Sequence, residues 1–210
     1  MFTVGKMCRL FGLIANKDVD VEFSFLRADK PFRELSKNNP HGWGIGYYKN
    51  HKVTIHKEPI NAFNSETFFP KAKEVKSRII ISHVRFSTQG NRTLGNTHPF
   101  SYEKWIFAHN GTARIRHNPQ FRLNFYHPVG ETDSEYAFCY ILDRIRELGA
   151  EKQNDLTALH RVIEQAANEI GQHGKFNFLL SNGEYLFAYA NRASLYYLFN
   201  IFIFVFLHPF

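Results

Sequence analysis

The sequence predicts an α+β fold with antiparallel sheets, and three observations carry this prediction. The order of segments is strands, then helices, then strands, which is typical of α+β domains. Two pairs of strand-like segments are separated by short polar turns, at residues 49–51 and 181–183, as in antiparallel hairpins. The 210 residues, of which 44% are hydrophobic and 21% charged, are enough for one domain with a sizeable core.

The chain begins with a predicted strand and a broken helix. Cys8 to Ala15 is mostly apolar and predicts a buried strand, which ends at a turn-like segment over residues 16–18. Val21 to Lys37 predicts a helix interrupted near Pro31, because a proline inside a helix removes a backbone hydrogen bond. The next predicted elements are a glycine-rich strand over residues 41–48, a strand over 52–57, a helix from Ser65 to Lys76, a strand from Ser77 to Phe86 and a short strand from Trp105 to Ala108.

The second half of the chain predicts a long loop, two helices and a hairpin. Residues 112–131 show little periodicity, and loops of that length are often lids over binding sites. The segment 132–135, Thr-Asp-Ser-Glu, is a capping-box pattern that opens a helix with apolar residues at helical spacing. The remaining elements are a helix from Asp155 to Ile170 and a hairpin of Lys175 to Leu180 with Tyr185 to Tyr189.

Composition argues against several classes of protein. The formal net charge is +7, but the basic residues are scattered without a run of five like charges, so we expect no nucleic-acid partner. The two cysteines, Cys8 and Cys139, lack the spacing of a zinc site or a disulfide framework, which favours a reduced, cytoplasmic setting. Residues 1–6 lack the apolar core of a secretory signal, and the apolar segment 195–207 is too short to span a bilayer comfortably. We therefore expect no membrane association.

Cys8 is the first candidate for chemistry. A cysteine attacks as the thiolate, so it needs a base or a lowered pKa. If Cys8 were the first residue of the mature chain, its own α-amine, with a pKa near ~8, could accept the thiol proton. His83, His98 and His109 could also approach Cys8 in space. The alternative interpretation is a buried structural cysteine on a strand.

Four further residues bear groups that suit amide chemistry on an amino acid. Asn110 and Gly111 could direct a side-chain amide and a backbone N–H at an oxyanion, although the same dipeptide is common in plain turns. The guanidinium of Arg85, at the end of an apolar strand, suits bidentate capture of a carboxylate. Asp133, in the first turn of a helix, could bind an amine, although it could equally serve only to complement the helix dipole.

Taken together and in this order, four segments resemble the class II glutamine amidotransferase domain, an N-terminal-nucleophile hydrolase. They are residues 7–12 (Met-Cys-Arg-Leu-Phe-Gly), 83–90 (His-Val-Arg-Phe-Ser-Thr-Gln-Gly), 109–111 (His-Asn-Gly) and 132–135 (Thr-Asp-Ser-Glu). The similarity is closest to a stand-alone branch and runs from Met7 to about Leu198. It implies a four-layer αββα sandwich with two antiparallel sheets, and no metal or organic cofactor.

The resemblance also implies roles for individual residues. Cys8 would be the nucleophile and its α-amine the base, so that attack on a side-chain amide releases ammonia and glutamate through a γ-glutamyl thioester. The other implied roles are Asn110 and Gly111 as the oxyanion hole, Arg85 as the ligand of the α-carboxylate, with Thr88 and His98 nearby, and Asp133 as the ligand of the α-amine.

The expected partner is glutamine or a γ-glutamyl small molecule, and any ammonia acceptor would lie on another polypeptide. Two alternatives stay open: a hydrolase of γ-glutamyl peptides that uses the same site, and a non-catalytic glutamine-binding module with a blocked Cys8. We treat residues 1–210 as a single domain in which residues 1–7 are an extension or propeptide. Residues 199–210 are an atypical apolar tail, which we interpret as a truncation that exposes an edge and lowers stability.

Overall fold

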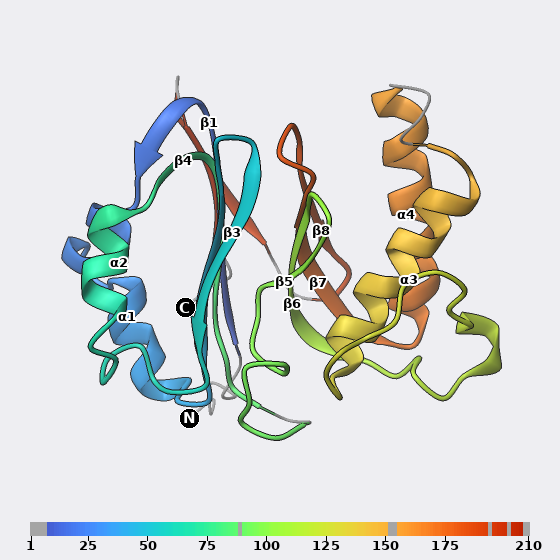
Figure 1. The fold of residues 1–210 in the computed structure, drawn as a ribbon, viewed down its shortest axis with the longest axis horizontal. Helices are drawn as coiled ribbons and strands as arrows, with labels where there is room; N and C mark the ends of the chain where they lie inside the picture. The colour runs from blue at the N-terminus through green and yellow to red at the C-terminus, as the bar shows by residue number, and fades with distance from the viewer. Residues whose placement is uncertain (1–7, 88–89, 151–154, 193–194, 201–202, 208–210) are drawn as a thin grey trace.

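The fold is a four-layer αββα sandwich, described from a computed structural model (Figure 1). The structure describes residues 8–87, 90–150, 155–192, 195–200 and 203–207. Two antiparallel sheets face each other in the middle, with helices on both outer faces (Figure 1). The sequence prediction of an α+β fold with antiparallel sheets is therefore confirmed.

The larger sheet has six strands in the described residues, in the order β3-β2-β4-β1-β10-β9. Its strands are β1 (Arg9–Asp20), β2 (Trp43–Lys49), β3 (Lys52–Glu58), β4 (Lys76–Val84), β9 (Tyr196–Asn200) and β10 (Ile203–Leu207). All its pairings are antiparallel, and β4 lies between β2 and β1. Part of the atypical tail thus forms strands, because β10 pairs with β1 and β9 pairs with β10.

The smaller sheet has four strands in the described part of the chain, in the order β5-β6-β7-β8. They are β5 (Phe100–Tyr102), β6 (Trp105–Ala113), β7 (Gly174–Ser181) and β8 (Leu186–Ala190). The hairpin of β7 with β8 was predicted, and β5 was not. The predicted strand end at Ala108 is wrong, since β6 continues through Asn110 and Gly111 and pairs with β7 as far as Ala113.

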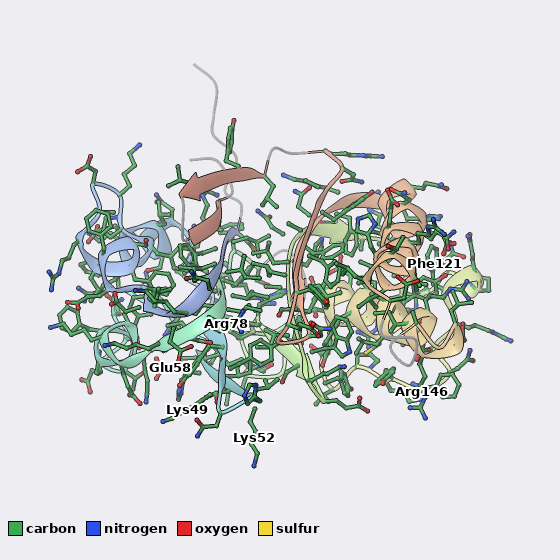
Figure 2. The ribbon with its side chains drawn as sticks, turned by 90° about the horizontal axis from the view of Figure 1, so that it is seen from above. Lys49, Lys52, Glu58, Arg78, Phe121 and Arg146 are labelled. Carbon is green, nitrogen blue, oxygen red and sulfur yellow. The ribbon has the colours of Figure 1, made fainter. Side chains whose placement is uncertain are left out.

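Helices cover the outer face of each sheet (Figure 1). The larger sheet is covered by a π-helical turn (Phe23–Arg27), α1 (Phe32–Leu35), a 3-10 turn (Ser36–Asn38) and α2 (Phe68–Glu74). The smaller sheet is covered by α3 (Asp133–Glu147) and α4 (Leu156–Gln172), and a 3-10 turn (Pro119–Phe121) lies in the loop before them. Figure 2 shows these layers from above, with Phe121 in the helical layer beside α3 and α4.

Two predicted boundaries are wrong for local reasons. The helix expected over Val21–Lys37 is three short turns, because Pro31 stands at the start of α1 and the backbone at Ala28 is already extended. The turn expected at residues 16–18 is a bulge, at which β1 shifts its register against β4 between Ile14 and Val19 and then continues to Asp20. The expected helix from Ser65 to Lys76 exists in shorter form as α2.

Three apolar clusters fill the three spaces between the layers. One joins the larger sheet to α1 and α2, and another joins the smaller sheet to α3 and α4. Between the sheets lies a small third cluster, formed by Leu10, Ile81, Ile106, Ala108 and Leu179. Because successive side chains of a strand point to opposite faces, Cys8, at the same parity as Leu10, faces the space between the sheets, as do His83 and Arg85.

The two sheets are tied together at the end opposite Cys8. The hydroxyl of Tyr48, near the end of β2, lies 2.9 Å from the backbone oxygens of Lys104 and Ser181, which belong to the smaller sheet and its first turn. At the Cys8 end, by contrast, His98 and Pro99 of the loop between β4 and β5 pack against Gly44 of β2. No helix among the described residues is both long and apolar enough to cross a membrane.

Candidate active site

A small cavity of about 30 Å³ opens at the Cys8 end of the sandwich, with space for only a few water molecules. It receives side chains from β1, the loop after β4, β6 and the start of α3. The residues that line it are Cys8, Arg85, Phe86, Ser87, His98, His109, Gly111, Thr132, Asp133 and Ser134.

Cys8 precedes β1 and is held against the residue that follows Arg85. The backbone N–H of Phe86 donates to the Cys8 Sγ at 3.1 Å, and the thiol is 3.3 Å from the Phe86 carbonyl oxygen. Burial raises the pKa of the Cys8 thiol, and the Phe86 hydrogen bond and the charge of Arg85 offset part of that increase. The thiol therefore needs a base in order to react near neutral pH.

Asn110 and Gly111 lie next to Cys8 in the middle of a strand. The Asn110 side-chain amide donates to the Cys8 carbonyl oxygen at 2.8 Å. A Cβ atom at Gly111 would lie only 1.9 Å from the Lys175 carbonyl oxygen on β7, and its φ of +154° also disfavours other residues. The glycine is therefore required by the close approach of two strands, and it leaves its own backbone N–H beside the cavity.

Arg85 is a buried cation at the cavity wall. Its backbone still continues the sheet, since its N–H donates to the Gly42 oxygen at 2.8 Å. Its guanidinium lies 3.3 Å from the carbonyl oxygen of Asn91 and 3.4 Å from that of Gly90. Arg85 thus brings a positive charge to the cavity lining.

Asp133 brings a negative charge to the opposite wall. It is the first residue of α3, after the N-cap Thr132, whose hydroxyl accepts from the Glu135 N–H at 3.2 Å. The Asp133 Oδ2 accepts from the Ala113 N–H at 2.6 Å and so joins the helix start to β6. The capping box is only half formed, because the Glu135 carboxylate accepts from the N–H groups of residues 129 and 130 instead.

Three buried histidines lie at the cavity: His98 and His109 line it, and His83 packs against His98. The rings of His83 and His98 are 4.3 Å apart, and their nitrogens have no hydrogen-bond partner within the described part of the chain. Burial lowers the pKa of His83 to about 3 and that of His98 well below its usual value. His109 instead contacts the Ser134 hydroxyl through Nδ1 at 2.8 Å. In the described residues, no group of His, Cys, Asp and Glu is arranged to hold a metal ion.

The loop that carries His98 is held from below by β2 and β3. The Lys57 Nζ donates to the carbonyl oxygens of Thr97 and Pro99, at 2.7 and 3.3 Å, on either side of His98. At Gly44 a Cβ atom would lie 2.2 Å from the His98 carbonyl oxygen, so the loop approaches β2 only because that residue is glycine. The alternate glycines of this strand thus serve the packing that positions the cavity wall.

Most of the residues singled out in the sequence come together here. Cys8, Arg85, His98, Gly111 and Asp133 line one cavity, and the Asn110 side chain reaches it through the Cys8 carbonyl group. Thr88 lies outside the described residues, as do residues 1–7.

Two contacts at the site were not predicted, because they depend on the folded backbone and on which strand residues face each other. The Phe86 N–H contacts the Cys8 sulfur, and Ser134 contacts His109. No side-chain pattern in the sequence predicts the contact of the Phe86 N–H with the Cys8 sulfur. The position of Ser134 beside Asp133, in the first turn of a predicted helix, was the available signal for its contact with His109.

Comparison with known proteins identifies the family of the chain. The sequence model of the family "Glutamine amidotransferases class-II" matches residues 7–205. A protein of Methanocaldococcus jannaschii, "Uncharacterized protein MJ1515", is 38% identical over 204 residues, which cover 91% of this chain and 54% of that protein. "Putative glutamine amidotransferase YafJ" of Escherichia coli is 35% identical over 196 residues, which cover 88% of this chain and 73% of that protein. The chain thus spans about half the length of the M. jannaschii relative.

Solved structures agree on the architecture. The crystal structure of a "predicted glutamine amidotransferase" from Pseudomonas aeruginosa superimposes with a TM-score of 0.65 at 29% identity, covering 96% of this chain and 83% of that one. The glutamine phosphoribosylpyrophosphate amidotransferase of B. subtilis superimposes with a TM-score of 0.69 at 18% identity, covering 95% of this chain and 41% of that one, and supports the fold alone. From the family match over residues 7–205, we conclude that this chain belongs to the class II glutamine amidotransferases.

Proposed function

We propose that the chain hydrolyses the side-chain amide of glutamine, with Cys8 as the nucleophile. The observation that carries this proposal is the single cavity that brings together a thiol, a guanidinium and a carboxylate from three separate parts of the chain. A free amino acid has one group of each sign at its α-carbon. Arg85 and Asp133 would hold the α-carboxylate and the α-ammonium, while the amide faces Cys8.

The proposed reaction proceeds in two halves. The Cys8 thiol gives its proton to the base, and the sulfur attacks the amide carbon to form a tetrahedral oxyanion. When the C–N bond breaks, the base returns a proton to the nitrogen, which leaves as ammonia. Water then gives a proton to the base and attacks the thioester carbon. The C–S bond breaks, and the base returns the proton to the leaving sulfur, which yields glutamate and the free thiol.

The oxyanion would be stabilised by the Asn110 side-chain amide and the Gly111 N–H. The amide nitrogen of Asn110 carries two hydrogens, and only one is used by the Cys8 carbonyl oxygen. Removal of one such donor typically lowers kcat by about 10²–10³.

The base in this proposal is the α-amine of Cys8. The buried histidines are poor candidates, because burial lowers the pKa of His83, His98 and His109. The amine exists only when Cys8 is the first residue of the mature chain, so activity requires removal of the residues before it.

The test combines intact mass with an ammonia assay. We expect active preparations to begin at Cys8, to release ammonia and glutamate from glutamine in equal amounts, and to lose activity in Cys8→Ala. Cys139→Ala is the matched control, since that buried cysteine lies on α3, outside the cavity lining. Glutamine and γ-glutamyl peptides are assayed side by side. Ammonia release by a chain that retains residues 1–7, or by Cys8→Ala, would refute the proposed mechanism.

A further inference from the structure

A second, much larger hollow adjoins the Cys8 cavity on the other side of Asp133. Its volume is about 740 Å³, and Asp133 lines both spaces. Gly111 borders the first and Ala113 the second, and residues two apart on a strand face the same side of the sheet. The hollows therefore lie side by side, about 7 Å apart along β6. We call the second one the arginine hollow, because Arg114 and Arg116 line it together with His117 and Glu131.

The two arginines differ from the acidic groups in how they are engaged. Within the described part of the chain, Arg114 makes no side-chain hydrogen bond or ion pair, and the Arg116 guanidinium only reaches the Gly130 carbonyl oxygen at 3.4 Å. The two carboxylates, in contrast, accept hydrogen bonds from N–H groups of the protein, Asp133 from Ala113 and Glu131 from Asn96. The formal charges of the two arginines and the two carboxylates balance, but the charged hydrogen-bond donors of the hollow are the guanidinium groups, to which the side chains of His117 and Asn118 add neutral donors.

From this arrangement we propose that the arginine hollow binds a compact oxyanion with two or more negative charges, such as a phosphate group or a polycarboxylate. Two guanidinium groups offer planar donor pairs that match either anion. The ligand is separate from glutamine, because Asp133 stands between the two spaces.

Binding of the anion would also strengthen the binding of glutamine, an inference that rests on the proposed function of Asp133. Two guanidinium groups in the same hollow weaken the attraction of Asp133 for the ammonium group of glutamine. An anion that neutralises them restores that attraction. Because coupling between two binding sites is reciprocal, glutamine would tighten anion binding by the same factor.

The first experiment measures binding by calorimetry, with inorganic phosphate and with citrate, on the whole chain at constant ionic strength. We expect saturable binding of at least one, and the comparison of the two decides between phosphate and carboxylate recognition. Arg114→Gln with Arg116→Gln should weaken binding by about tenfold or more. Lysine at both positions keeps the charge but not the fork and should give an intermediate affinity. Arg122→Gln removes an exposed arginine of the same loop that does not line the hollow, and should bind as the parent does.

A second measurement tests the coupling. Glutamine affinity should rise about two- to tenfold with saturating anion in the parent chain, and should not respond in the double glutamine variant. Absence of saturable binding at millimolar concentration, or equal binding by the double variant, would overturn the anion site. Because glutamine affinity is measured by calorimetry, a chain that releases no ammonia contradicts the proposed hydrolysis without affecting this test.

Discussion

Asp133 gives the sharpest test of the proposed glutamine site, because one carboxylate has two separable tasks. Its structural task is to accept the N–H of Ala113 through Oδ2 at 2.6 Å. Its proposed functional task is to present a negative charge to the cavity that it lines. Asp133→Asn keeps a carbonyl oxygen for the Ala113 N–H and removes the charge. The variant should therefore fold normally and bind glutamine poorly.

The magnitude follows from the interaction that is lost. A hydrogen bond between charged partners contributes about 1.5–3 kcal/mol. At about 1.4 kcal/mol per factor of ten, kcat/KM for glutamine should fall roughly 10- to 100-fold. The favourable interaction of a carboxylate with the start of α3 contributes about 0.3–1 kcal/mol, so the free energy of unfolding should change by no more than about 1 kcal/mol.

Two further variants separate the tasks in ammonia-release and thermal-unfolding assays. Asp133→Ala also leaves the buried Ala113 N–H without its acceptor, which costs about 1–3 kcal/mol and should lower Tm by several degrees. Asp143→Asn is the matched control on the same helix, where the carboxylate accepts three backbone N–H groups of residues 124–126. It should lower Tm and leave kcat/KM unchanged. Parental kcat/KM in Asp133→Asn would refute the assigned role.

Three other predictions follow from the surroundings of the site. Burial lowers the pKa of His83 to about 3. As pH falls, this histidine is therefore protonated in the unfolded chain before it is protonated in the folded one. The free energy of unfolding consequently decreases as pH falls from ~6.5 toward 3. Urea unfolding measures how much the free energy of unfolding decreases between pH 7.5 and pH 5. This decrease should be about 2 kcal/mol smaller in His83→Phe than in the parent chain, and an equal decrease in both proteins would contradict the prediction. Gly44→Ala should lower the free energy of unfolding by about 2 kcal/mol or more, because its Cβ would meet the His98 carbonyl oxygen at 2.2 Å. Gly95→Ala, whose nearest neighbour would be 3.8 Å away, is its control and should be nearly neutral. Asn110→Ala should reduce kcat by about 10²–10³ with little effect on KM; a rise in KM alone would instead assign this residue to substrate binding.

The sequence predicted the elements that depend on local pattern. The two hairpins, the helix opened by Thr132 and the long loop before it are present in the structure, since alternation, turn residues and capping residues act over a few positions. The site residues came from the resemblance of four segments to a family, because no single segment distinguishes a nucleophile from a structural cysteine.

Features that depend on partners distant in sequence were not predictable. The Asn-Gly pair at residues 110–111 is typical of a turn. In the structure, β6 continues through both residues because β7 pairs with them. The carbonyl oxygen of Lys175 lies so close that residue 111 has to be glycine. The bulge in β1 likewise depends on β4 as its partner. The contact of His83 with His98 joins residues that are 15 positions apart, one on a central strand and one in a loop, and no periodicity connects them.

The contacts of the Tyr48 hydroxyl limit which part of the molecule can move to admit a ligand. If the chain binds glutamine as proposed, the cavity of about 30 Å³ at Cys8 has to enlarge to admit it. The Tyr48 hydroxyl links the larger sheet to the smaller one, with both contacts at 2.9 Å, at the end of the sandwich remote from Cys8. The two sheets cannot separate as rigid units without breaking these Tyr48 contacts. In the proposed function, admission of glutamine would therefore depend on the described segments beside the cavity, residues 85–87, 90–98 and 114–131, and their rearrangement would limit the rate at which substrate enters.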